Sequence, residues 1–84
     1  MVMEIYRSRE EIVIAILKEL NLRPLRREEL YMVLARKVSL PRSVFDRHLK
    51  FLVERKRIEK GPNKNDSYKL TKRGSKFLEA LIDS

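Results

Sequence analysis

Apolar residues recur along the first part of the chain with the spacing of a helix that buries one face. From Ser8 to Leu20 they stand three and four positions apart, which predicts a first helix. The apolar positions are Ile12, Val13, Ile16, Leu17 and Leu20. Ser8 is a favourable N-cap with Glu11 three residues later, which is the capping-box pattern, and Asn21 follows as the expected left-handed stop.

The same spacing predicts two more helices, separated by the short gap that a helix-turn-helix requires. The second covers residues 26–37 and lacks a Ser, Thr, Asp or Asn cap at its start. Its apolar positions are Leu30, Tyr31, Leu34, Ala35 and Val38. Ser39 supplies a cap and Pro41 a first helical residue for the third helix, residues 41–56. The apolar stripe of that helix consists of Phe45, Leu49, Leu52 and Val53.

Alternation of polar and apolar residues then predicts a two-stranded hairpin over residues 57–70, with the turn-rich GPNKN between its strands. Ile58, Tyr68 and Leu70 are expected to face inward, because such a hairpin is marginal unless it packs on other elements. Thr71 caps a last helix whose apolar stripe consists of Phe77, Leu78, Leu81 and Ile82. The expected fold is mainly α with a small β-hairpin. It forms one domain, 1–84, because 43% apolar content allows one modest core.

The third helix and the hairpin also carry the excess positive charge of the chain. Residues 1–41 hold eight Lys and Arg against six Asp and Glu, residues 42–76 hold twelve against four, and residues 77–84 hold none against two. The net charge of +8 therefore resides in the second half of the chain. A concentrated basic surface selects a polyanionic partner, and nucleic acid is the first candidate.

Several classes of function find no support in the residues. Cysteine is absent, and His48 is the one histidine, expected to pack or hydrogen-bond, so no metal site is predicted. There is no glycine-rich phosphate loop or Ser-His-Asp set, so neither an enzyme, a cofactor nor a small-molecule ligand is expected. We expect a cytoplasmic protein without a membrane segment, since no long apolar run or secretory pattern occurs. The 38% charged content and the absence of glutamine suggest a thermophile.

Two motifs resemble those of winged-helix transcriptional regulators. Residues 47–52, RHLKFL, are similar to the core of ArsR- and MarR-type recognition helices, and residues 68–74, YKLTKRG, resemble the YxLTxxG that closes the wing in MarR-, PadR- and small archaeal regulators. The resemblance implies a winged helix-turn-helix with a three-helix core, a two-stranded wing and a C-terminal helix. It further implies a sequence-specific regulator of archaeal or archaeal-virus type, with residues 41–56 in the major groove of double-stranded DNA and residues 57–70 on the backbone or in the minor groove.

The sequence departs from this family pattern at two positions. The glycine that usually ends the recognition helix is replaced by Lys56, so the chain must leave the helix differently or Lys56 must accept about 1 kcal/mol of left-handed strain. Asp46 stands where Ser is common. An acid on this face repels phosphates, but it can also accept a hydrogen bond from the N4 amino group of cytosine.

The outer face of the third helix and the wing hold the candidate DNA-binding residues. On the helix they are Arg42, Ser43, Asp46, Arg47 and Lys50. Arg42 and Arg47 are the predicted base readers, because arginine forks onto guanine O6 and N7. On the wing they are Lys60, Lys64, Asn65 and Lys69. The alternative for each group is an ordinary solvated surface.

Two other functions and the oligomeric state complete the hypotheses. A basic winged helix can dock an acidic protein partner within an assembly, or bind DNA or RNA as an architectural protein without sequence preference. Apolar residues in excess of one core predict a homodimer, which would place two recognition helices about one turn of DNA apart. These residues are Val2, Ile5, Tyr6, Ile14, Phe77, Leu78, Leu81 and Ile82.

Overall fold

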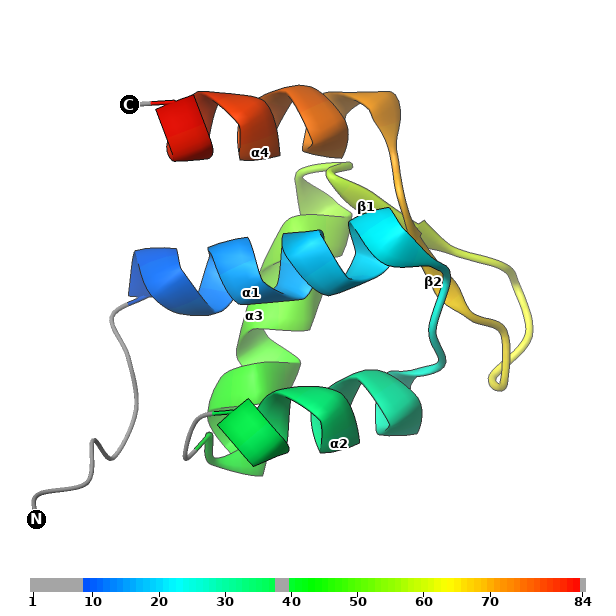
Figure 1. Ribbon diagram of the computed structural model, residues 1–84. Helices are drawn as coiled ribbons and strands as arrows, with labels where there is room; N and C mark the ends of the chain where they lie inside the picture. The colour runs from blue at the N-terminus through cyan, green and yellow to red at the C-terminus, as the bar shows by residue number, and fades with distance from the viewer. Residues whose placement is uncertain (1–8, 38–39, 84) are drawn as a thin grey trace, which may run out of the picture.

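Four helices and one two-stranded antiparallel sheet make up the residues that the computed structural model describes, 9–37 and 40–83. The elements are α1 (Arg9–Leu22), α2 (Arg27–Lys37), α3 (Arg42–Glu54), β1 (Ile58–Lys60), β2 (Tyr68–Leu70) and α4 (Lys72–Asp83). In Figure 1, α1 lies between α2 and α4, α3 runs behind α1, and the hairpin projects to one side. The predicted order of elements and the winged helix-turn-helix architecture are confirmed.

The predicted apolar stripes meet in one core. The largest side chains that are fully buried are Phe45, Ile16, Leu17, Leu30, Leu34, Leu52 and Ile58. Each such burial contributes about 1.5–3 kcal/mol to the free energy of folding. Tyr68 and Leu70 pack against this core from the sheet, as expected of the inward side of the hairpin. No helix in residues 9–37 and 40–83 has both the length and the apolarity that crossing a bilayer requires.

Several helix boundaries correct the sequence predictions. The third helix, expected over residues 41–56, ends at Glu54. Asn21 is not a left-handed stop: α1 continues through it to Leu22, and Pro24 then ends the helix because proline disfavours the helical conformation of the residue before it. Pro41 is the N-cap of α3 rather than its first helical residue, with an extended ψ of 143°, so its carbonyl accepts the first amide bonds of the helix. Of the other predicted caps, Ser8 and Ser39 lie outside the described residues.

Some predicted core positions are exposed, because the helices extend past the core at their ends. Val53, in the last turn of α3, is 39% exposed, and Ile82, in the last turn of α4, is 53% exposed. Ala35 is also exposed, and Val38 lies outside the described residues. The buried part of the α3 stripe is completed instead by His48, which the chain shields to 9% exposure.

The α2 helix has no Ser, Thr, Asp or Asn before its first residue. Its N-terminus is capped by a side chain from its own first turn. The carboxylate of Glu29 reaches back and accepts a hydrogen bond from the backbone N–H of Arg26, at 2.9 Å. This is the second half of a capping box, in which a Glu at the third helical position satisfies the N-cap amide. Glu29 therefore fixes the start of α2 at Arg27.

The exit from α3 is a Schellman motif with lysine where glycine is usual. Lys56 has a φ of 61° and donates its N–H to Val53 O at 2.9 Å, and Arg57 donates its N–H to Leu52 O at 3.0 Å. These are the two reversed hydrogen bonds that define the motif. Of the two possibilities open from the sequence, the chain takes the left-handed conformation at Lys56.

This corner is bound directly to the corner between β2 and α4. The Thr71 hydroxyl donates to Lys56 O at 2.7 Å and accepts the N–H of Gly74 at 2.9 Å, so the predicted cap of α4 also holds the end of α3. Thr71 N–H donates to Arg57 O at 3.2 Å. At Gly74, a Cβ would stand 1.9 Å from Arg57 O, so only glycine allows this approach.

The sheet is wider than the predicted hairpin. β1 and β2 pair with Ile58 opposite Leu70 and Lys60 opposite Tyr68. On the other edge of β2, Leu25 in the α1–α2 connection exchanges two hydrogen bonds with Tyr68, at 3.1 and 2.8 Å. The hairpin is therefore joined to the helical core through backbone as well as side chains.

Lys56→Gly is expected to raise the free energy of unfolding by roughly 0–1.6 kcal/mol. Glycine removes roughly 1–2 kcal/mol of left-handed strain and adds roughly 0.4–1 kcal/mol of unfolded-state entropy. Urea denaturation measures the change. Lys56→Ala is the matched control, because it removes the same charge but keeps a Cβ. Equal free energies of unfolding for the Gly and Ala variants would show that a Cβ at position 56 causes no backbone strain, and would contradict the prediction.

Candidate nucleic-acid interface

The outer side of α3 and the wing border one open cleft of about 470 Å³. Its lining residues are Arg27, Asp46, Leu49, Lys50, Val53, Glu54, Lys60 and Tyr68. The apolar ones are Leu49 and Val53 of α3 and Tyr68 of β2. Asp46 and Lys50 from the helix and Lys60 from the wing bring three of the predicted site residues to the same cavity, beside the acidic Glu54.

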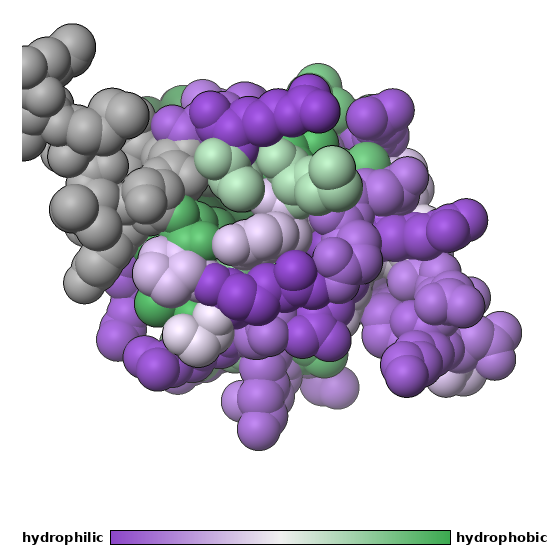
Figure 2. Space-filling model, turned by 90° about the horizontal axis from the view of Figure 1, so that it is seen from below, coloured by the Kyte–Doolittle hydropathy of each residue, from purple (hydrophilic) through white to green (hydrophobic). Residues whose placement is uncertain are grey.

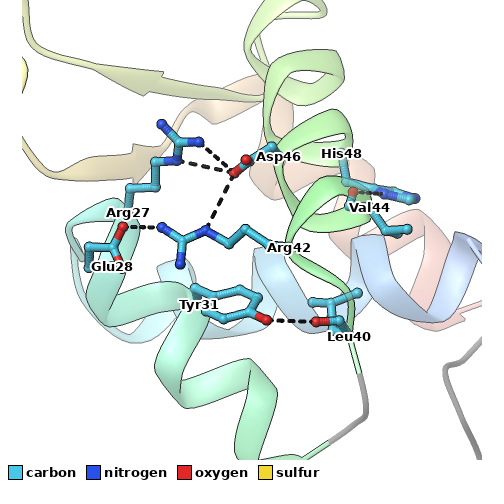
Figure 3. A network of polar contacts seen from close by, with 8 residues as sticks. All are labelled: Arg27, Glu28, Tyr31, Leu40, Arg42, Val44, Asp46 and His48. Carbon is cyan, nitrogen blue, oxygen red and sulfur yellow. Dashed lines mark hydrogen bonds and ion pairs between the residues drawn. The ribbon is translucent and has the colours of Figure 1, made fainter.

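Four of the five candidate side chains on α3 are exposed to solvent, and Asp46 is partly exposed. Of these, Ser43, Arg47 and Lys50 form no side-chain ion pair or hydrogen bond with the described residues. Arg42 and Asp46 instead belong to a network of charges between α2 and α3 (Figure 3). The structure therefore divides the predicted helix residues into a free group and a bound group.

Asp46 is the centre of this network. Its Oδ1 accepts a hydrogen bond from Arg27 Nε at 3.1 Å, forms an ion pair with Arg27 Nη2 at 2.7 Å, and lies 4.0 Å from Arg42 Nε. The hydrogen bond to Asp46 raises the pKa of the Arg27 guanidinium, although desolvation acts against it. The Arg27 side chain is half exposed, so the pair is a surface ion pair of about 0–1 kcal/mol rather than a source of stability.

Arg42 is fixed from three sides. It donates to Glu28, faces Asp46, and its guanidinium carbon lies 4.6 Å from the centre of the Tyr31 ring. Tyr31 itself packs against Phe45, with ring centroids 5.0 Å apart, and donates its hydroxyl to Leu40 O at 2.8 Å. Arg42 therefore lies on a rigid aromatic surface at the helix-turn-helix junction.

His48 is nearly buried and forms a hydrogen bond within α3. Its Nδ1 lies 2.8 Å from Val44 O, and because a carbonyl only accepts, Nδ1 carries the proton and donates it. The predicted packing and hydrogen-bonding role of His48 is confirmed. In residues 9–37 and 40–83, no three His, Cys, Asp or Glu side chains are grouped closely enough to hold a metal ion.

The wing residues occupy three different positions. Lys64 and Asn65 are exposed at the tip. Lys60 bends over the turn, donating to Gly61 O at 3.2 Å and Asn63 O at 2.7 Å. Lys69 forms an ion pair with Glu59 across the sheet, with Nζ 3.6 Å from Oε2.

The wing loop is itself ordered by an acid. Asp66 accepts the N–H of Asn63 at 2.9 Å and returns its own N–H to Asn63 O at 3.1 Å. A Cβ at Gly61 would stand 2.2 Å from the Asp66 carboxylate, so any other residue there would displace this side chain. In Figure 2 hydrophilic side chains dominate the visible face, and the wing forms a separate hydrophilic lobe at its right.

Neither Lys69 nor Arg47 lines this cleft. Lys69 borders a different surface depression, together with Arg23 of the α1–α2 connection and Lys72 of α4, and Arg47 borders a third one beside Arg9, His48 and Phe51. Alternation along β2 explains the position of Lys69, because Tyr68 and Leu70 turn to the core side while Lys69 turns the other way.

A separate apolar groove of about 350 Å³ lies between α1, α3 and α4. Its lining residues are Arg9, Glu10, Val13, Phe51, Leu52, Arg57, Phe77 and Leu81. The Arg57 guanidinium carbon lies 3.6 Å from the centre of the Phe77 ring. Burial lowers the pKa of Arg57, and the neighbouring charges of Arg55 and Arg73 lower it further.

Sequence reasoning missed Arg27 and Tyr31 as parts of this interface. Arg27 looked like any solvent-facing residue of its helix, and Tyr31 like an ordinary core aromatic. One signal was present: an acid at position 46 within a basic face requires a cationic partner. The sequence does not identify that partner, because the crossing of α2 and α3 decides which of several arginines reaches Asp46.

Comparison with known proteins agrees with this geometry. The family model described as winged helix-turn-helix matches residues 6–83. A crystal structure of a proposed transcriptional regulator from Thermoplasma acidophilum is similar, with a TM-score of 0.69 and 32% sequence identity over 83% of this chain and 73% of that chain. No curated protein sequence gives a match.

Proposed function

Because the chain belongs to the winged helix-turn-helix family, we propose that it is a transcriptional regulator that binds double-stranded DNA with sequence preference. Residues 1–84 act as one DNA-binding domain without catalytic activity. The similar protein from Thermoplasma acidophilum, described as a proposed transcriptional regulator, supports this function. It also supports an archaeal, thermophilic source, while a MarR-, ArsR- or PadR-type affiliation rests on the motifs at residues 47–52 and 68–74.

The observation that carries this proposal is the exposed basic side of α3 next to the wing. An α-helix fits the major groove, and its outer side chains then reach base edges. Arg47 is our first choice for base reading, because none of the described residues forms an ion pair or hydrogen bond with its side chain. Lys50 lies one turn farther along the same face, and Ser43 one turn before.

The wing contributes contacts that do not depend on sequence. Lys64 and Asn65 at its tip extend toward the phosphate backbone or the minor groove. Lys60 orders the turn and adds its charge from the cleft side. Lys69, which faces away from the cleft, reaches DNA only if the duplex bends around the wing.

A homodimer is the second part of the proposal, and the apolar groove is its proposed interface. Phe77 and Leu81 of α4 are partly buried against the core, while Phe51 and Ile82 are more exposed. A twofold interface at this groove would cover these side chains on both copies. The two α3 helices would then enter successive major grooves, about 34 Å apart.

The structure limits which of the predicted apolar residues can serve such an interface. Leu78 is 5% exposed and belongs to the core, and Ile14 packs against the core. Val2, Ile5 and Tyr6 lie outside the described residues. The exposed end of α4 therefore provides the position at which to test the interface.

Duplex DNA binding is expected to weaken steeply with salt. Counterion release predicts that log K falls linearly with log salt, with a slope of roughly −0.9 for each phosphate contacted. A site selected from a random pool should be preferred over random duplex by about a thousandfold or more. Fluorescence anisotropy titrations measure both. Absence of duplex binding at low salt would favour a protein-interaction module, and equal binding of all duplexes an architectural role.

Arg47→Ala should reduce binding to the selected site by roughly 1–3 kcal/mol and relax the preference at one base pair. Lys64→Ala should instead reduce the affinity for all DNA sequences alike. It should also make the slope of log K against log salt less negative by about one. Repeating the selection and the titrations with each variant separates the two effects. Equal, sequence-independent losses in both variants would contradict base reading by α3.

Ile82→Glu should convert the dimer to a monomer, because it places a charge at the exposed edge of the proposed interface. Leu22→Glu is the matched control: Leu22 is 77% exposed at the end of α1, away from the groove. Light scattering at micromolar concentration gives the mass of each. A monomeric wild-type protein, or a dimer that survives Ile82→Glu, would contradict this interface.

A further inference from the structure

We infer that Asp46 is a positioning residue that raises sequence selectivity at the expense of affinity, and that Arg27, which it holds, is an additional DNA-contacting residue. The inference rests on the proposed DNA-binding function and deepens it. Asp46 puts a negative charge on the surface that meets a polyanion, which by itself weakens binding. The geometry shows what the carboxylate does in return.

Asp46 fixes two guanidinium groups with one oxygen. Arg27 approaches Oδ1 with Nε and Nη2, a two-pronged contact, while Arg42 faces the same oxygen through Nε (Figure 3). Arg42 is held on its far side by Glu28. The result is a row of alternating charges, Arg27, Asp46, Arg42 and Glu28, that spans the first turns of α2 and α3.

The contact with Asp46 leaves Arg27 with unused hydrogen-bond donors. A guanidinium carries five N–H groups, and Asp46 faces two of those of Arg27, one on Nε and one on Nη2. Three hydrogens remain, and two of them lie on the edge formed by the two terminal nitrogens, enough for a forked contact with a phosphate or a guanine. Arg27 also lines the cleft between α3 and the wing, so this edge lies where DNA would pass.

Holding the arginines in place affects selectivity more than affinity. A free arginine side chain has about 2 kcal/mol of rotamer entropy and can adapt to many neighbouring groups. Once it is fixed, it binds well only where an acceptor lies at the right place. Exposed ion pairs of this kind contribute about 0–1 kcal/mol to folding, so their main consequence is the position of the side chains.

Asp46→Asn tests the inference, because it keeps the size of the side chain and removes the charge. Random duplex should bind more tightly to this variant, while the selected duplex gains less or loses, so that their affinity ratio falls by about tenfold, within the usual coupling energy of neighbouring residues. Glu54→Gln is the matched control, since Glu54 is exposed on the same helix and lines the same cleft. Glu54→Gln should raise the affinity for the random and the selected duplex equally, so that the ratio of the two affinities stays as in the wild-type protein.

A double-mutant cycle with Arg27→Ala separates positioning from direct reading by Asp46. If Asp46 acts through Arg27, Arg27→Ala also lowers the ratio and adding Asp46→Asn changes it little further. Full additivity of the two losses, as expected if Asp46 alone reads a cytosine, would overturn the inference, and so would an unchanged ratio in Asp46→Asn. A wild-type protein that binds no duplex would overturn the proposed function as well.

Discussion

The left-handed turn at Lys56, held by Thr71 and Gly74, is the constraint on which the rest of the structure depends. It reverses the chain at the end of α3 and sends it directly into β1. The Thr71 hydroxyl binds this corner to the start of α4, and the missing side chain of Gly74 lets the helix approach Arg57 O. The third helix, the sheet and the last helix therefore meet at this corner.

Because the wing and α3 are joined there, the relative position of the two elements is set by backbone hydrogen bonds and by the Thr71 hydroxyl. The cleft is lined by apolar side chains, among them the exposed Val53, and by charged ones. The basic residues on the outer side of α3 are not equivalent: Arg47 and Lys50 are exposed, whereas Arg42, although 43% exposed, contacts Glu28, Asp46 and Tyr31. A basic surface of this kind is partly organised by its own acids.

The sequence predicted those features that depend on local spacing. Periodicity indicates which side of a helix is buried, so the stripe of Phe45, Leu49 and Leu52 was correct, and Thr71 was identified as a cap from its position. The turn at Lys56 was left open between two possibilities, since the left-handed conformation of a lysine depends on contacts from Thr71. The Arg27–Asp46 pair depends on how two helices cross, and the exposure of Val53 on where the core ends. Spacing contains neither kind of information.

The short pairing of Leu25 with Tyr68 connects distant parts of the chain. Leu25 stands two residues before Arg27 at the start of α2, and its two hydrogen bonds join it to the strand that returns from the wing. Bending the hairpin away from the body must either break both bonds or pull the α1–α2 connection along with it. A movement of the hairpin and a movement of the first turn of α2 are therefore coupled. The coupling runs through backbone hydrogen bonds and needs no side chain.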